Sequence, residues 1–274
     1  MLQKNASPSP LDDAEKLKSQ MFIHAYTSLK TDRIDEAEGM YNKMMDMGDA
    51  QPNVYEGLYE IYSKREDMEK AENILFEGVK AYPDDTGLLF AQINHFLKQD
   101  KTDELIEKLE LAIEKESENV SLYATLGNVH ERLHNDAVTK GDMELAQGHF
   151  DKAIAQYKKA TEIDPDYVAA VYSIGALYYN KAANKTNELN ELANDYSKEG
   201  TAKYEKLKEE VNAIFDESLP YFKKAEQMDP NDLNTLIALK EIFARKNDFD
   251  TSNEFKARME KVQNGEKNDG SFFK

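Results

Sequence analysis

Apolar residues recur along the chain at helical intervals, and the arrangement repeats. The segment YATLGNVH, residues 123–130, has a large residue, an aliphatic residue three positions later, a glycine next and a ring three positions after that glycine. The segment VYSIGALY, residues 171–178, has the same order. Intervals of three and four place such residues on one face of a helix. The two segments therefore predict two equivalent amphipathic helices.

A second pattern predicts the helix that follows each of these. In AIAQYKKATEIDP, residues 153–165, a small residue, a ring, a second small residue and a proline stand four, three and five positions apart. The segment SLPYFKKAEQMDP, residues 218–230, repeats the order. Small residues let two helices approach closely, and a proline stops the helix that precedes it. The chain is thus expected to consist of helix pairs.

This combination resembles the tetratricopeptide repeat, a helix–turn–helix unit of about 34 residues. The register supports the resemblance, because the residue that opens the second helix recurs six times. These positions are Ala37, Ala71, Leu105, Ala153, Ser218 and Ser252, at intervals of 34, 34, 48, 65 and 34. Three intervals equal one repeat, whereas the other two exceed it by 14 and 31 residues. The resemblance covers nearly the whole chain.

We therefore predict an all-α fold, a right-handed α-solenoid of about six tetratricopeptide-like helix pairs. The expected pairs are 18–31 with 34–47, 52–65 with 68–81, 86–99 with 102–115, 120–139 with 142–163, 168–197 with 202–227, and 233–246 with 249–263. Residues 1–17 are expected to be a disordered leader, 18–263 a single solenoid domain and 264–274 a flexible tail. Each pair needs its neighbours to bury its apolar face.

The extra residues fall between the first and second helix of the fourth and fifth pairs, near 134–149 and 182–215. We expect longer helices that form antiparallel hairpins, with turns near Gly141 and Gly200. The larger insert has apolar residues at intervals of three and four on both arms: Leu189, Leu192 and Tyr196, then Tyr204, Leu207, Val211 and Ile214. Two interpretations stay open: the arms simply pack on each other, or they form a dimerisation or docking platform.

Composition limits the partners. The 274 residues include 53 Asp and Glu against 35 Lys and Arg, a formal net charge of −18. Such a chain repels nucleic acid and anionic membranes, and no apolar run approaches the ~20 residues that span a bilayer. There is no cysteine, which excludes disulfides and thiolate metal sites. The missing cysteine and a start that looks trimmed favour an exported or periplasmic protein over a cytoplasmic one.

One segment matches a zinc protease motif, H-E-x-x-H, at His130, Glu131 and His134. Two histidines four apart share a helix face and could hold zinc beside a catalytic glutamate. However, His130 occupies the ring position of the fourth repeat, so we interpret it as a packing residue. A third ligand could come only from the insert, at His149, Glu144 or Asp136. No nucleotide-binding or hydrolase motif is present, so we expect neither metal nor cofactor and no enzyme.

In the resembled family, the first helices of successive repeats line a concave, partner-binding face. The resemblance assigns this groove to Phe90, Asn94, Asn128, Arg132, Tyr172 and Tyr179. Asn94 and Asn128 stand at the same position of consecutive repeats and could bind a peptide backbone. Glu56 and Glu60 also occupy groove positions, so a clamp for a C-terminal carboxylate is not expected. The groove could instead be merely hydrated, or filled by the N-terminal leader.

The leading hypothesis is a non-enzymatic scaffold that binds a protein or peptide in this groove. The alternative is a structural protein that self-assembles into a homodimer through the hairpin of residues 182–215. A zinc-dependent hydrolase built on residues 130–134 is the remaining candidate.

Overall fold

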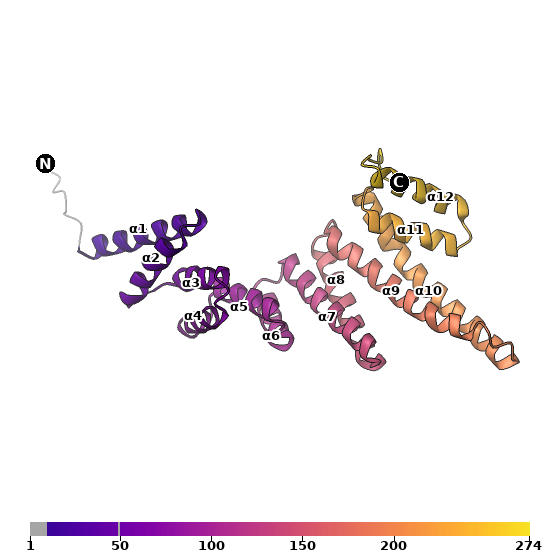
Figure 1. Cartoon of the computed structure of the whole chain (residues 1–274), viewed down its shortest axis with the longest axis horizontal. Coiled ribbons are helices and arrows are strands. Elements are labelled where there is room, and N and C mark those ends of the chain that lie inside the picture. The colour runs from indigo at the N-terminus through magenta and orange to yellow at the C-terminus, as the bar shows by residue number, and fades with distance from the viewer. Residues whose placement is uncertain (1–9, 49) are drawn as a thin grey trace. The chain divides into compact units, whose positions relative to one another are not determined.

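The computed structural model describes residues 10–48 and 50–274, with side chains from residue 15 onwards. All regular structure in this part of the chain is helical (Figure 1). The helices form six consecutive pairs: α1 (Pro10–Lys30) with α2 (Ile34–Asp46), α3 (Pro52–Lys64) with α4 (Met68–Ala81), α5 (Thr86–Gln99) with α6 (Thr102–Lys115), α7 (Val120–Lys140) with α8 (Met143–Ile163), α9 (Val168–Leu192) with α10 (Lys198–Met228), and α11 (Leu233–Arg245) with α12 (Phe249–Gln263). The expected all-α fold of tetratricopeptide-like pairs is confirmed.

Aspartates begin many of these helices by accepting a backbone N–H group that the first turn leaves unpaired. Asp142 accepts from Leu145 at 3.1 Å, directly after Gly141, whose φ of +77° ends α7. The turn expected near Gly141 is therefore confirmed. The turn expected near Gly200 lies earlier: α9 ends at Leu192, and Ser197 accepts the N–H of Gly200 at 2.9 Å.

The six residues that open the second helices are buried, with Ala37, Ala71, Leu105, Ala153 and Ser218 fully so and Ser252 8% exposed. The glycines of the first helices explain how closely the paired helices approach. A Cβ atom at Gly127 would lie 2.6 Å from the ring of Tyr157, and one at Gly57 would lie 2.4 Å from the ring of Tyr41. These rings therefore pack directly on the neighbouring backbone, which only glycine permits.

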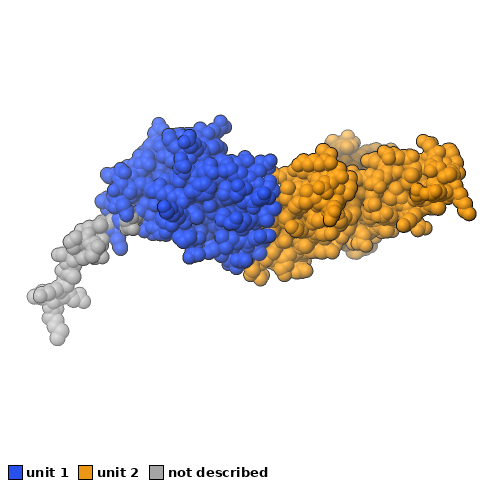
Figure 2. All heavy atoms as spheres, turned by 90° about the horizontal axis from the view of Figure 1, so that it is seen from below, with its two compact units in different colours: residues 1–115 blue, residues 116–274 orange. Residues whose placement is uncertain are grey.

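The chain divides into two compact units, Met1–Lys115 and Glu116–Lys274, drawn in blue and orange in Figure 2. This division differs from the single domain expected over residues 18–263. The first unit has one continuous apolar core that runs through α1 to α5, from Met21 to Ala91. In the second unit, the largest cluster joins α9, α10, α11 and α12 around Phe222 and Phe255. The first three helix pairs belong to one unit and the last three to the other.

The two expected hairpins are present as long helices, 21 residues each for α7 and α8 and 25 and 31 for α9 and α10. The apolar stripes of the larger hairpin face each other, because Leu189 and Val211 are only 9% and 2% exposed. Lys185 and Glu210 pair across the two arms at 2.9 Å. Only Tyr196, in the turn, is largely exposed, at 87%. The arms thus pack on each other.

The ends of the chain differ from the expected boundaries. Helix α1 begins at Pro10, within the expected leader, because proline suits the first helical position where no N–H partner exists. The rest of that leader, residues 1–9, lies outside the described residues. The expected flexible tail instead folds back on the last helix pair, where Asn268 is 8% exposed. None of the described helices has the length and apolar character needed to cross a membrane.

Candidate partner-binding groove

The first unit contains a groove of about 660 Å³ between α3 and α5. Both helices are the first of their repeat, so the groove lies on the face where the sequence predicts partner binding. Two of the predicted residues, Phe90 and Asn94, line it. The other lining residues are Glu56, Tyr59, Glu60, Ser63, Lys64, Gly87, Ala91, Leu97 and Lys98. The groove therefore combines an aromatic and aliphatic floor with carboxylate and ammonium groups.

Asn94 and Glu56 are polar residues of this groove whose side chains have no hydrogen bond or ion pair within the described chain. Asn94 is exposed and makes no hydrogen bond within the described chain. Glu56 is half-buried and has neither a hydrogen bond nor a cationic partner there, and its carboxylate lies against the backbone of Gly87. Burial and, secondarily, the negative charge of Asp85 raise the pKa of Glu56. A half-buried carboxylate without a cation favours a ligand that supplies one.

Glu60, one turn further along α3, is already neutralised. Its two oxygens accept hydrogen bonds from Lys30 at 3.0 and 3.1 Å, and Lys64 lies 3.3 Å from it. The two glutamates that the sequence places in equivalent roles thus differ. Glu60 belongs to an ion-pair network, whereas Glu56 has no cationic partner in the described chain.

The predicted groove residues of the second unit are bound to their own neighbours. The hydroxyl of Tyr157 lies 2.6 Å from Oδ1 of Asn128 and 2.7 Å from Oε2 of Glu131. Tyr179 donates a hydrogen bond to Glu241, and its ring packs against Phe215 at a centroid distance of 5.3 Å. Burial, followed by Glu241, raises the pKa of Tyr179. These side chains stabilise contacts between helices of the same unit.

The two remaining predicted residues are partly buried. Arg132 on α7 already has a polar interaction. Tyr172 on α9 lines a second pocket of about 440 Å³ with Asp229 and Asp232. Asn94 and Asn128 belong to different units, so the expected pair of asparagines stays a prediction. Sequence reasoning missed Tyr157, whose hydroxyl engages Asn128, because its ring position signals packing and says nothing of its hydroxyl.

The segment with the protease-like motif lies on α7, and its two histidines contact α8. His130 and His134 are 4% and 6% exposed, which confirms the packing interpretation of His130. His134 donates from Nδ1 to the carbonyl of Ala146 at 2.8 Å. Nδ1 of His130 lies 3.3 Å from Nδ1 of His149. Burial, then His149 and Lys152, lower the pKa of His130 to about 4.

The motif's glutamate, Glu131, accepts a hydrogen bond from Tyr157 at 2.7 Å. Among the residues that the structure describes, no three histidine or carboxylate side chains are placed to hold one metal ion, the insert residues Asp136, Glu144 and His149 included.

Known proteins share this architecture. A sequence model of the TPR repeat matches residues 141–181, and no curated protein sequence matches the chain. YrrB, described as "a TPR protein with an unusual peptide-binding site", has a similar structure, with a TM-score of 0.54 and 17% identity over 80% of this chain and 89% of that one. MamA AMB-1 gives a TM-score of 0.52 and 18% identity over 79% and 93%.

These observations define a helical-repeat protein. Its helix pairs have the fold of tetratricopeptide-repeat proteins, and residues 141–181 match the TPR model, as the glycine, ring and proline positions of the sequence indicate. These two structural likenesses, at 17% and 18% identity, concern the fold alone.

Proposed function

We propose that the protein is a non-enzymatic scaffold that binds an extended segment of a partner protein in the groove between α3 and α5. The single observation that carries this proposal is the groove itself, which holds an unpaired glutamate and an unpaired asparagine above an apolar floor. A fold-level parallel supports it, since the described property of YrrB is a peptide-binding site. A few polar groups placed among apolar side chains are typical of specific binding sites.

The groove chemistry defines the kind of segment. Asn94 has both a donor and an acceptor, so it can bind the N–H and C=O groups of an extended backbone. Phe90 is half-buried and offers an apolar surface for a side chain. Glu56 favours a lysine or arginine, or an amino terminus. The net charge of −18 further favours a basic partner through long-range attraction.

The test starts from the full chain and a phage-displayed peptide library. Enriched peptides are expected to contain a lysine or arginine, and calorimetry is expected to show about tenfold weaker binding to Glu56→Gln, consistent with the loss of a charge-assisted contact. Glu191→Gln, an exposed change in the hairpin of the second unit, is the matched control and should bind as wild type does. Equal affinity for both variants would rule out the groove.

Self-assembly through the α9–α10 hairpin is the second candidate, and one observation favours it. Tyr196 is 87% exposed in the turn, and exposed tyrosines are common interface anchors. Light scattering on wild type and Tyr196→Ser separates the two candidates. A dimer that the substitution dissociates supports assembly, whereas a monomer that still binds selected peptides supports the groove.

A further inference from the structure

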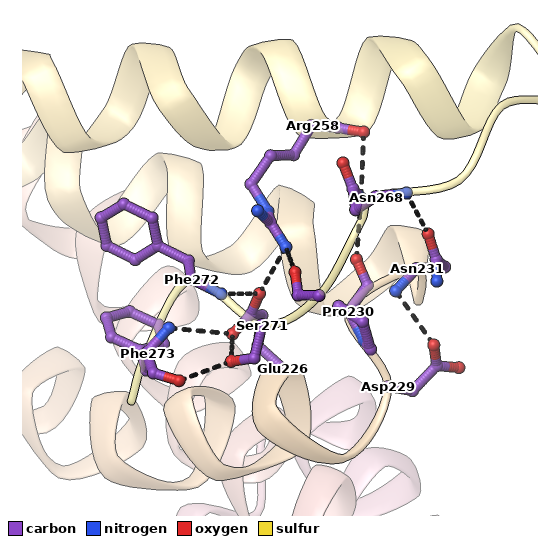
Figure 3. A network of polar contacts seen from close by, with 10 residues as sticks. Glu226, Asp229, Pro230, Asn231, Arg258, Asn268, Ser271, Phe272 and Phe273 are labelled. Atoms are coloured by element: carbon purple, nitrogen blue, oxygen red, sulfur yellow. Dashed lines mark hydrogen bonds and ion pairs between the residues drawn. The ribbon is translucent and has the colours of Figure 1, made fainter.

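Residues 264–274, here called the C-terminal strap, form an extended segment that crosses α10 and α12 (Figure 3). Near the start of the strap, Gly265 has a φ of +82° and turns the chain back after α12. Beyond this turn the strap has no helix of its own. Its contacts with the helices therefore resemble those of a bound peptide more than those of a further repeat.

Glu226, on α10, is fully buried at the centre of these contacts. Its Oε1 accepts from Arg258 at 2.9 Å and from the backbone N–H of Phe272 at 2.8 Å. Its Oε2 accepts from the Ser271 hydroxyl at 2.6 Å and from the N–H of Phe273 at 3.4 Å. Three of the four donors come from the strap. Without the strap, the carboxylate would retain only Arg258 of these four donors.

Arg258 binds the backbone of the strap from the other side. The same guanidinium nitrogen that reaches Glu226 also donates to the carbonyl of Gly270. The pair thus recognises one backbone carbonyl and two backbone N–H groups of an extended chain. Upstream, Asn268 donates its side-chain amide to the carbonyl of Pro230 at 2.8 Å, and its backbone N–H bonds Asn231 at 2.8 Å. This fixes the register of the strap.

The aromatic pair supplies the apolar part of the contact. The ring of Phe272 lies 5.0 Å from that of Phe255, and the ring of Phe273 lies 5.6 Å from it, measured between centroids. Lys223 lies over the Phe273 ring at 5.1 Å. Phe255 is fully buried although it belongs to the last helix. The strap therefore covers an apolar face that the last repeat of an array would otherwise expose.

We propose that α10 and α12 form a peptide-binding site, distinct from the groove of the first unit, for extended segments of the pattern Asn-x-Gly-Ser-aromatic-aromatic. The strap occupies this site within the same chain and closes it. A partner protein that carries such a segment binds only where the strap is displaced. The Glu226–Arg258 pair binds the backbone and so provides affinity, whereas specificity comes from the Ser271 hydroxyl, the Asn268 amide and the two ring positions beside Phe255.

The test uses the full chain with the strap weakened by Phe272→Ala and Phe273→Ala together. A fluorescein-labelled peptide with the sequence of residues 266–274, amidated at its end, is titrated and followed by anisotropy. It is expected to bind the weakened chain at least tenfold more tightly than wild type, in which the strap competes. A peptide with alanine in place of Ser271, Phe272 and Phe273 is expected not to bind.

Two further variants locate the site. Adding Glu226→Gln to the weakened chain is expected to abolish binding, whereas Glu217→Gln, an exposed change on the same helix, should leave it intact. Circular dichroism establishes that each variant keeps its helices. Equal binding to wild type and weakened chain, or no binding to a helical weakened chain, overturns the proposal.

If the weakened chain loses its helices, a protease site inserted after Gly265 provides a second route. The chain then folds intact and is cut afterwards, and the labelled peptide is expected to exchange into the cut protein but not into the uncut protein. Failure to exchange after the cut fragment has been removed by gel filtration also overturns the proposal.

Discussion

The first-helix surfaces of the two units occupy equivalent repeat positions, yet their polar side chains are satisfied in different ways. In the first unit, Glu56 and Asn94 have no partner in the described chain and border a groove of about 660 Å³. In the second, Asn128 and Tyr179 are hydrogen-bonded to neighbouring helices. Side chains at equivalent positions of the repeat can therefore be unpaired in one unit and bonded to neighbouring helices in the other.

The largest expected effect concerns a contact that occurs within each unit, in which a ring of a second helix packs on a glycine of the first helix. In Gly127→Ala the new Cβ atom would meet the ring of Tyr157 at 2.6 Å, and this buried ring cannot move away easily. We expect a loss of about 3 kcal/mol in the free energy of unfolding, measured by urea denaturation. Gly175→Ala is the matched control, because its nearest contact would be 3.2 Å away. Equal losses would contradict the packing account.

The next effect is a pH dependence that a buried histidine of the second unit contributes. His130 occupies the ring position that Phe96 fills in the first unit, and burial lowers its pKa from 6.5 to about 4. Between pH 6.5 and 4, His130 is protonated in the unfolded chain but largely neutral in the folded chain. The free energy of unfolding therefore falls as the pH drops from 6.5 to 4. The loss is on the order of 2 kcal/mol.

His130→Phe tests this effect, since it gives the second unit a phenylalanine ring at the position that Phe96 occupies in the first unit. The free energy of unfolding of this variant, measured at several pH values, is expected to fall less steeply between pH 6.5 and 4 than that of wild type. Identical slopes would show that His130 titrates normally.

A smaller loss of stability is expected when a hydrogen-bonded polar group of the second unit is removed. Tyr157→Phe removes the hydroxyl beside Asn128 and Glu131 while it keeps the ring. We expect a loss of about 1–2 kcal/mol, because a partly buried carboxylate loses a donor. Thermal unfolding at neutral pH measures it, with Tyr196→Phe as the control, since that exposed tyrosine has no such contact.

The smallest effect on stability is expected in the groove of the first unit. Asn94→Ala removes a side chain that bonds to nothing in the described chain, so the free energy of unfolding should change by less than about 0.5 kcal/mol. A loss above 1 kcal/mol would mean that Asn94 stabilises the fold and is not reserved for a partner.

The helix pairs could be predicted from the sequence because paired helices pack closely only if small and ring residues recur at fixed positions of each repeat. The boundaries of α3 to α8 agree with expectation to within about a residue, and Gly141 and Asp142 mark the fourth turn as predicted. The turn of the fifth pair was wrong, because α10 begins after Ser197, whose side chain accepts the N–H of Gly200, the residue at which the turn was expected.

The candidate site was less predictable. Repeat position places Phe90, Asn94 and Tyr179 on one type of surface, but it does not reveal that Tyr179 bonds Glu241, 62 residues away. Such pairings depend on which side chains of neighbouring repeats meet. The folded strap could not be predicted for the same reason. A tail of polar residues and two phenylalanines does not indicate a structure by itself, because its partners Glu226 and Phe255 are known only from the fold.

The most direct test of the central claim compares matched asparagines in the two units. Peptides selected against the full chain are titrated by calorimetry into wild type, Asn94→Ala and Asn128→Ala. The account predicts at least tenfold weaker binding to Asn94→Ala and wild-type affinity for Asn128→Ala. Weaker binding to Asn128→Ala alone, with Asn94→Ala unchanged, would contradict it.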